Sequence, residues 1–146
     1  MKIDLQLDAD CAELSVTIHA REMNEEVRAL LQKLSAQGPE LLLGFRGGAA
    51  TPLEPSEILR GYAASQKVFL VAKSGEFQSR LRLYELEERL SPFGFVRISN
   101  SEIVNLKEVR DFDMNLSGTI RVRLKDGSST YVSRRYVARI KEILGT

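Results

Sequence analysis

Two short segments of the sequence carry polar side chains that could read a nucleic acid, and the first is Ser99-Asn100-Ser101. It lies between two apolar stretches, residues 95–98 and 103–105. An asparagine has a donor and an acceptor side by side, which matches the N6/N7 edge of adenine, and serine hydroxyls can reach phosphates. The alternative is an Asx turn, in which Asn100 bonds to its own backbone. On the residues alone, the turn is the preferred interpretation.

The second segment is the arginine pair Arg134 and Arg135. Bidentate pairing of arginine with guanine is the commonest base-specific contact in the major groove. Adjacent side chains on an irregular segment point to different sides, so one arginine could read a base while the other holds a phosphate or packs on the protein. Ser133 could cap the following helix or bond a phosphate. On sequence alone, however, a pair of arginines is usually only a surface feature.

No enzyme site can be assembled from this sequence. His19 is the only histidine, so neither a Ser-His-Asp triad nor a His-rich metal site can be drawn. Cys11 is the only cysteine, which rules out an internal disulfide, and its acidic, alanine-flanked context offers nothing to activate it. Gly47-Gly48 lacks the glycine spacing of phosphate-binding loops. We therefore expect no catalytic residue, no metal and no cofactor.

Short antiparallel strands are expected to position the polar segments. Apolar and polar residues alternate in brief runs that are separated by turn signals, which indicates a mainly β fold, α+β overall. Strands are expected at residues 57–64, 67–72, 77–81, 95–98, 103–105, 109–115, 119–124 and 130–133. Short amphipathic helices are expected at 83–90, stopped by Ser91-Pro92, and at 136–144.

The N-terminal part predicts a small β-β-α-β unit that precedes the β domain. Its elements are expected at Lys2–Asp8, Glu13–His19, Met23–Gln37 and Leu41–Phe45. The domain boundaries that follow are a unit at 1–45, a Gly/Pro-rich linker at 46–55 and a β domain at 56–146. A unit of this size is too small to fold well alone and must pack on something.

Charge is distributed unevenly along a chain whose formal net charge is only +1. Residues 1–50 hold five basic and eight acidic residues, whereas residues 51–146 hold 16 basic and 12 acidic ones. This asymmetry suits a polyanion partner, although such an excess is common. The N-terminus lacks the apolar core of a signal peptide, and no apolar run approaches the length of a membrane span. We expect an intracellular, cytoplasmic protein.

Three ordered blocks resemble the LytTR family of DNA-binding domains. They are R-I-S-N-S-x-I-V-N-L from Arg97, I-x-V-x-L-x-D-G from Ile120 and V-S-R-R-Y-V from Val132. The resemblance runs from about Glu57 to the C-terminus. It implies a bacterial transcription regulator that reads DNA with an all-β module and no recognition helix. It also implies an elongated stack of small antiparallel sheets with short helices, which matches the strand pattern.

The resemblance implies DNA-binding roles for individual residues. Asn100 and Arg135 match the base-reading positions, which reverses the preference for an Asx turn. A third DNA-contacting loop of the family falls at the turn 64–66, where a lysine, Lys67, serves a phosphate more naturally than a base. The expected backbone or supporting contacts are Gln66, Lys67, Arg97, Ser99, Ser101, Ser133 and Arg134. Further candidate phosphate contacts are Arg121, Arg123 and Lys141, of which the first two could instead mark the solvent face of a strand.

We therefore expect a transcriptional regulator that binds double-stranded DNA sequence-specifically in the major groove. Residues 1–45 are too few for a receiver domain, so we expect control by another route, with a homodimer on tandem half-sites. Some stand-alone members of the family are paired with small membrane-protein inhibitors, which suggests such a partner by analogy only. The alternative function is a protein-protein interaction module without DNA binding. The target sequence, the regulated genes and the choice between activation and repression are not encoded in these patterns.

Overall fold

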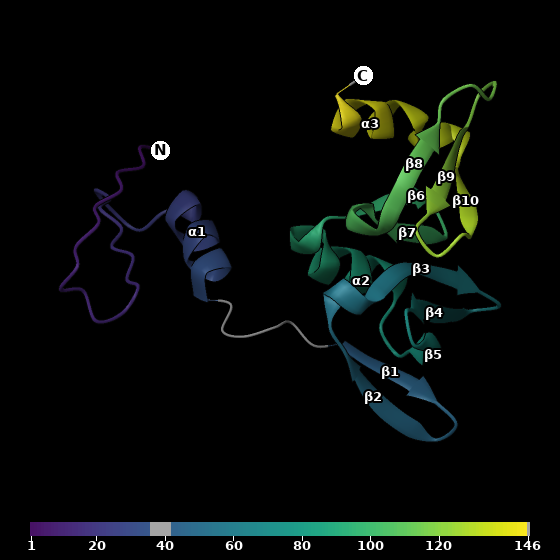
Figure 1. Ribbon diagram of the computed structural model, residues 1–146, viewed down its shortest axis with the longest axis horizontal. Helices are drawn as coiled ribbons and strands as arrows, with labels where there is room; N and C mark the ends of the chain where they lie inside the picture. The colour runs from purple at the N-terminus through teal and green to yellow at the C-terminus, as the bar shows by residue number, and fades with distance from the viewer. Residues whose placement is uncertain (36–41, 146) are drawn as a thin grey trace. The chain divides into compact units, whose positions relative to one another are not determined.

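The computed structural model describes residues 1–35 and 42–145, and it divides into two compact units, Met1–Gly38 and Pro39–Thr146. The helices are α1 (Glu25–Ser35), α2 (Leu83–Leu90) and α3 (Arg134–Leu144). The strands are β1 (Leu42–Arg46), β2 (Ala49–Leu53), β3 (Ile58–Ala64), β4 (Lys67–Ala72), β5 (Gly75–Ser79), β6 (Phe95–Ser99), β7 (Glu102–Asn105), β8 (Val109–Asp113), β9 (Ile120–Leu124) and β10 (Ser129–Val132) (Figure 1). Nearly all regular structure belongs to the second unit.

The first unit differs from the expected β-β-α-β arrangement. Its helix α1 forms, capped by the side chain of Asn24, whose Oδ1 accepts a hydrogen bond from the Val27 N–H at 2.9 Å. The segments Lys2–Asp8 and Glu13–His19 contain no strand. Alternation is a side-chain pattern, and a strand also needs a neighbour for its backbone groups, which these segments lack within the described chain. The expected helix end at Gln37 lies outside the described residues.

The expected linker at residues 46–55 is not a linker. It contains the last residue of β1, the turn and all of β2, which together with the rest of β1 form a β-hairpin. β1 pairs with β2 over the full length of both strands, and β1 also pairs with β5. Gly47 and Gly48 have positive φ angles of 58° and 81°, as a two-residue primed turn requires. Leu42 and Leu53 are buried across the hairpin. The hairpin therefore belongs to the β domain, and a boundary at residue 45 cuts through it.

A seven-stranded antiparallel sheet forms the larger layer of the second unit. Its strand order is β2-β1-β5-β4-β3-β7-β6, and α2 packs on it. Leu83, Leu86 and Leu90 of α2 are buried, as the spacing predicted. The apolar side chains of this core include Ile58, Leu70, Phe77, Phe95 and Ile103. This core fixes where β3, β4 and β7 end, and so where their turns lie.

A three-stranded sheet, β10-β9-β8, packs with α3 on a second core. Ile98 and Val104 of the large sheet enter this core together with Ile120 and Ile140. The Glu102 carboxylate bridges the two sheets. Its Oε2 accepts a hydrogen bond from Arg60 of β3 at 3.1 Å, and its Oε1 accepts one from the Thr130 hydroxyl of β10 at 2.7 Å. The expectation of a mainly β fold built from antiparallel sheets and short helices is confirmed.

Candidate nucleic-acid interface

Three connections meet at one end of the second unit: the β3–β4 turn, the β6–β7 turn and the β10–α3 junction. The Ala63 N–H donates to the Ser101 carbonyl at 2.8 Å, which joins the first connection to the second. The Ser133 N–H donates to the Ile98 carbonyl at 2.9 Å, which joins the third to the second. The segments that the sequence singled out are thus brought together on one edge. We call this the recognition edge, residues 65–67, 99–101 and 133–136.

The β6–β7 turn holds Asn100 outward without using it as an Asx turn. The Ser101 N–H donates to the Ser99 Oγ at 3.2 Å, so a serine closes this turn. Asn100 is exposed, and its Oδ1 accepts a hydrogen bond from the Tyr136 hydroxyl at 3.2 Å. Its Nδ2 has no hydrogen-bond partner among the described residues. An amide oxygen has two lone pairs, so the whole amide edge can still pair with a base.

The β10–α3 junction leaves the hydroxyl of Ser133 unused. Ser133 occupies the N-cap position of α3 with extended backbone angles, but its side chain makes no capping hydrogen bond. Its carbonyl accepts from the Tyr136 N–H at 2.9 Å, which begins the helix. Of the two roles considered for Ser133, capping by the side chain is therefore not observed, and the half-buried hydroxyl has no described hydrogen-bond partner.

The two arginines lie in the first turn of α3, so the expectation of an irregular segment before a helix at 136–144 is wrong by two residues. The Arg134 side chain lies against the β8–β9 connection, because its Nε is 3.4 Å from the point that a Cβ on Gly118 would occupy. Arg135 is exposed and has no hydrogen-bond or ion-pair partner among the described residues. Both guanidinium groups keep their donors for a ligand, since Arg134 is also exposed without a described hydrogen-bond partner, and the pair differs in that Arg134 lies close to Gly118.

The β3–β4 turn is tight and strained. Ser65 and Gln66 have positive φ angles of 51° and 64°, which non-glycine residues rarely adopt. Gln66 and Lys67 are exposed and without a partner in the described part of the chain. Glycine would relieve the strain, but it would remove the polar side chains that this turn presents.

Arg97 lies beneath the surface rather than on it. Its side chain is 15% exposed, and its Nε is 4.0 Å from the Glu87 Oε1 of α2. Its Nη1 is buried and has no hydrogen-bond partner among the described residues. Because it is largely buried, Arg97 is better placed to make the neighbouring surface more positive than to contact DNA directly.

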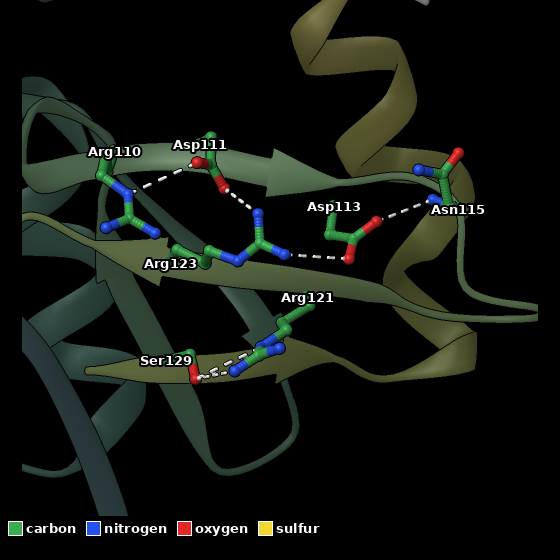
Figure 2. A network of polar contacts seen from close by, with 7 residues as sticks. All are labelled: Arg110, Asp111, Asp113, Asn115, Arg121, Arg123 and Ser129. Atoms are coloured by element: carbon green, nitrogen blue, oxygen red, sulfur yellow. Dashed lines mark hydrogen bonds and ion pairs between the residues drawn. The ribbon is translucent and has the colours of Figure 1, made fainter. Parts of the chain in front are cut away.

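The candidate phosphate contacts Arg121 and Arg123 are engaged within the small sheet (Figure 2). Arg123 donates to the Asp111 Oδ1 at 3.0 Å and to the Asp113 Oδ2 at 3.1 Å. The Arg121 guanidinium lies 3.3 and 3.4 Å from the Ser129 Oγ, as Figure 2 shows. Arg110 extends the same network through the Asp111 Oδ2 at 3.4 Å. This β8–β9 face keeps Arg123 between two carboxylates, so its charge is compensated.

Two side chains near these surfaces have shifted pKa values. A hydrogen bond to Glu76, with burial as the second cause, raises the pKa of the Tyr62 hydroxyl above its ordinary value. A hydrogen bond from the Ser128 hydroxyl lowers the pKa of Asp126. Near pH 7, Tyr62 is therefore neutral and Asp126 is ionised, so neither group switches its charge there.

Tyr136 is a residue of this edge that the sequence did not single out. Its hydroxyl orients Asn100, a residue 36 positions away in the chain. The tyrosine belongs to the V-S-R-R-Y-V block, but nothing in that block indicates a partner on a distant turn. Within residues 1–35 and 42–145, no group of three or more His, Cys, Asp or Glu is placed to hold a metal ion. The helices of that described part include none that is long and apolar enough to cross a membrane.

Comparisons with known proteins identify a matching family, similar sequences and a similar fold. The family model described as LytTr DNA-binding domain matches residues 49–145. Proteins named as HTH-type transcriptional regulators from Staphylococcus aureus strains NCTC 8325 / PS 47 and COL are each 34% identical over 145 residues, which cover 99% of this chain and 98% of those proteins. A solved LytTr DNA-binding domain of a putative methyl-accepting/DNA response regulator from Bacillus cereus has a similar fold, with a TM-score of 0.71, 21% identity and coverage of 75% of this chain and 100% of that chain.

Proposed function

This chain belongs to the LytTr DNA-binding domain family, and we propose that it reads double-stranded DNA through its recognition edge. It is a DNA-binding transcription regulator. The observation that carries the finer proposal is the placement of Asn100 and Arg135. Both are exposed, and both keep donor groups without a described partner. Asn100 projects from the β6–β7 turn and Arg135 from the first turn of α3, and the hydrogen bond from the Ser133 N–H to the Ile98 carbonyl holds these segments side by side.

The chemistry of the two readers differs. Asn100 presents an amide to adenine, and Tyr136 limits the rotation of that amide before DNA arrives. Arg135 presents its guanidinium to guanine, and each good bidentate pair contributes roughly 1–3 kcal/mol of discrimination. Phosphates on either side would be held by the other polar groups of the edge, Gln66, Lys67, Ser99, Ser101 and Ser133. Arg134 would support the junction, and Arg97 would add charge from beneath.

Reading by connections rather than by a helix-turn-helix follows from the order of elements. A helix-turn-helix needs two consecutive helices joined by a short turn. In this chain five strands, β6 to β10, separate α2 from α3. The relatives carry an HTH-type name, but α2 and α3 do not form that motif here. We propose that the major groove is entered by the β6–β7 turn and the β10–α3 junction.

Self-association through residues 1–38 is a second part of the proposal. Apolar side chains alternate along the first segment, and Ile3, Leu5 and Leu7 are at least 81% exposed. The relatives match over nearly the whole chain, so this unit has a counterpart in them. Apolar surface of this extent favours burial against a partner. A second copy of the chain would supply the missing strand neighbours and place two domains on tandem half-sites.

Sedimentation of the full chain and of a chain that begins at Pro39 tests this part. We expect a dimer for the full chain and a monomer for the shorter one. The shorter chain keeps β1, whose Leu42 is buried in the core. Equal oligomeric states would contradict self-association. If the full chain is a monomer, the exposed apolar side chains of the first segment would instead bind a different partner, such as the membrane-protein inhibitor that the resemblance suggests.

Selection of duplexes from a randomised DNA library tests the proposed function as a whole. The full chain should enrich one sequence, and binding should weaken steeply with salt, about 10³-fold or more between 50 and 200 mM if several phosphates are held. A protein-protein interaction module would enrich no duplex.

A further inference from the structure

A hollow of about 780 Å³ lies beside the recognition edge, between the β3–β4 turn, β5 and the first turn of α2. Gln66 and Lys67 of the recognition edge are among the residues that line it, so the two surfaces are continuous. Three further cationic residues line it, Arg80, Arg82 and Arg97. Among the described residues that line it, none is acidic. The hollow is therefore the place where basic side chains from β4, β6 and the β5–α2 connection converge.

Most of the charge in the hollow is not compensated by nearby carboxylates. Lys67 and Arg82 are exposed, and neither side chain has a partner in the described parts of the chain. The Arg80 guanidinium lies 4.0 Å from the centre of the Phe45 ring and has no ion-pair partner among the described residues. Arg97 is also among the lining residues, and its buried Nη1 has no hydrogen-bond partner among the described residues. Its nearest ion-pair contact, with Glu87, is long at 4.0 Å.

The first turn of α2 adds to this potential. Leu83 and Tyr84 line the hollow, and the N-terminal end of a helix carries partial positive charge. Glu85 offsets part of it, because its Oε1 accepts a hydrogen bond from the Arg82 N–H at 3.0 Å. Glu85 and Glu87 lie near the hollow but do not line it. The balance favours an anion, and the wide opening suits a chain of phosphates that passes through.

We propose that this hollow holds DNA backbone phosphates flanking the bases that Asn100 and Arg135 read. The inference rests on the proposed function and extends it, because it adds a contact outside the recognition edge. Phosphate chemistry could also come from a free anion. We favour the DNA backbone because the hollow shares Gln66 and the exposed Lys67 with the recognition edge, where the duplex is proposed to bind.

The test compares two duplexes and three variants of the full chain. The duplex that the wild type selects is prepared with flanks of about six base pairs and again trimmed to the selected bases. Arg82→Gln removes one charge from the hollow, Arg82→Lys keeps it, and Lys125→Gln removes an exposed charge from the β9–β10 turn, at the other end of β10 from Ser133. Thermal unfolding checks that all three variants fold.

We expect Arg82→Gln to weaken binding of the flanked duplex roughly 3- to 10-fold and to lower the salt slope by about one. Binding of the trimmed duplex should stay unchanged, and Arg82→Lys should restore most of the affinity. Lys125→Gln should leave both affinities as they are. The same loss on both duplexes, no loss on either, or an equal loss from Lys125→Gln would overturn the proposal.

A titration with inorganic phosphate separates the two sources of phosphate. Side-chain signals of Arg80 and Arg82 that saturate with phosphate alone, together with no effect of the flanks, would assign the hollow to a free anion and contradict the inference. The larger proposal fails separately, since it requires that the wild type select a duplex at all.

Discussion

The recognition edge and the β8–β9 face both carry arginines, but those arginines have opposite surroundings. On the β8–β9 face, Arg123 is held between Asp111 and Asp113 (Figure 2). On the recognition edge, Arg135 has no described partner. A guanidinium already bonded to carboxylates would have to give up those bonds to reach DNA. In our proposal, uncompensated donors rather than the number of basic residues therefore distinguish the DNA-binding surface.

The largest effect should come from Arg135→Ala. Loss of one bidentate base contact should weaken the selected duplex about 10- to 100-fold, measured by fluorescence anisotropy. Binding to a random duplex should fall only modestly, because one positive charge is lost. Arg134→Ala serves as the matched control, with a smaller loss because Arg134 packs on the β8–β9 connection. A larger loss from Arg134→Ala would invert the assignment of the pair.

Tyr136→Phe should have an intermediate effect on specific binding. It removes the hydroxyl that orients Asn100, and we expect a loss of roughly 3- to 10-fold, as for one hydrogen bond. A double-mutant cycle checks the cause. In an Asn100→Ala background the same change should have little further effect. Additive losses would mean that the tyrosine acts by some route other than Asn100.

Lys67→Ala should weaken binding by a few-fold on any sequence. A phosphate contact carries no sequence information, so the selected and random duplexes should lose affinity alike. The slope of log affinity against log salt should decrease by about one. A loss confined to the selected duplex would show that the β3–β4 turn reads bases.

Arg123→Ala should have the smallest effect on DNA binding, within about twofold. The free energy of unfolding of this variant should instead fall by about 1 kcal/mol, because two partly exposed ion pairs are lost at once. Urea unfolding and anisotropy on the same sample measure both quantities. A binding loss comparable with that of Arg135→Ala would remove the distinction between the two surfaces.

Local sequence signals predicted the elements whose determinants lie close together in the chain. Leu83, Leu86 and Leu90 lie on one face of a helix that Ser91-Pro92 stops, and α2 has the predicted bounds. The bounds of strands β3 and β4 also match the predicted ranges 57–64 and 67–72 to within one residue. The three polar connections could be identified as candidates because their residue types suit base edges and phosphates.

Features that depend on distant partners could not be predicted in this way. Gly47-Gly48 has the composition of a linker, and only the pairing of β1 with β5 shows that the hairpin belongs to the sheet. The alternation in residues 2–19 predicted strands that find no neighbour within the described chain. Arg97 faces α2 because of how the sheet and helix pack, which its own neighbours in sequence do not reveal.

The most direct test of the account combines changes in the protein with changes in the DNA. Each base of the selected duplex is replaced in turn, and binding is measured for the wild type, Asn100→Ala and Arg135→Ala. We predict that Asn100→Ala becomes indifferent at one adenine and Arg135→Ala at one guanine, while each variant still discriminates at the other position. If both variants keep the full base preference of the wild type, the recognition edge does not read the sequence and the account is wrong.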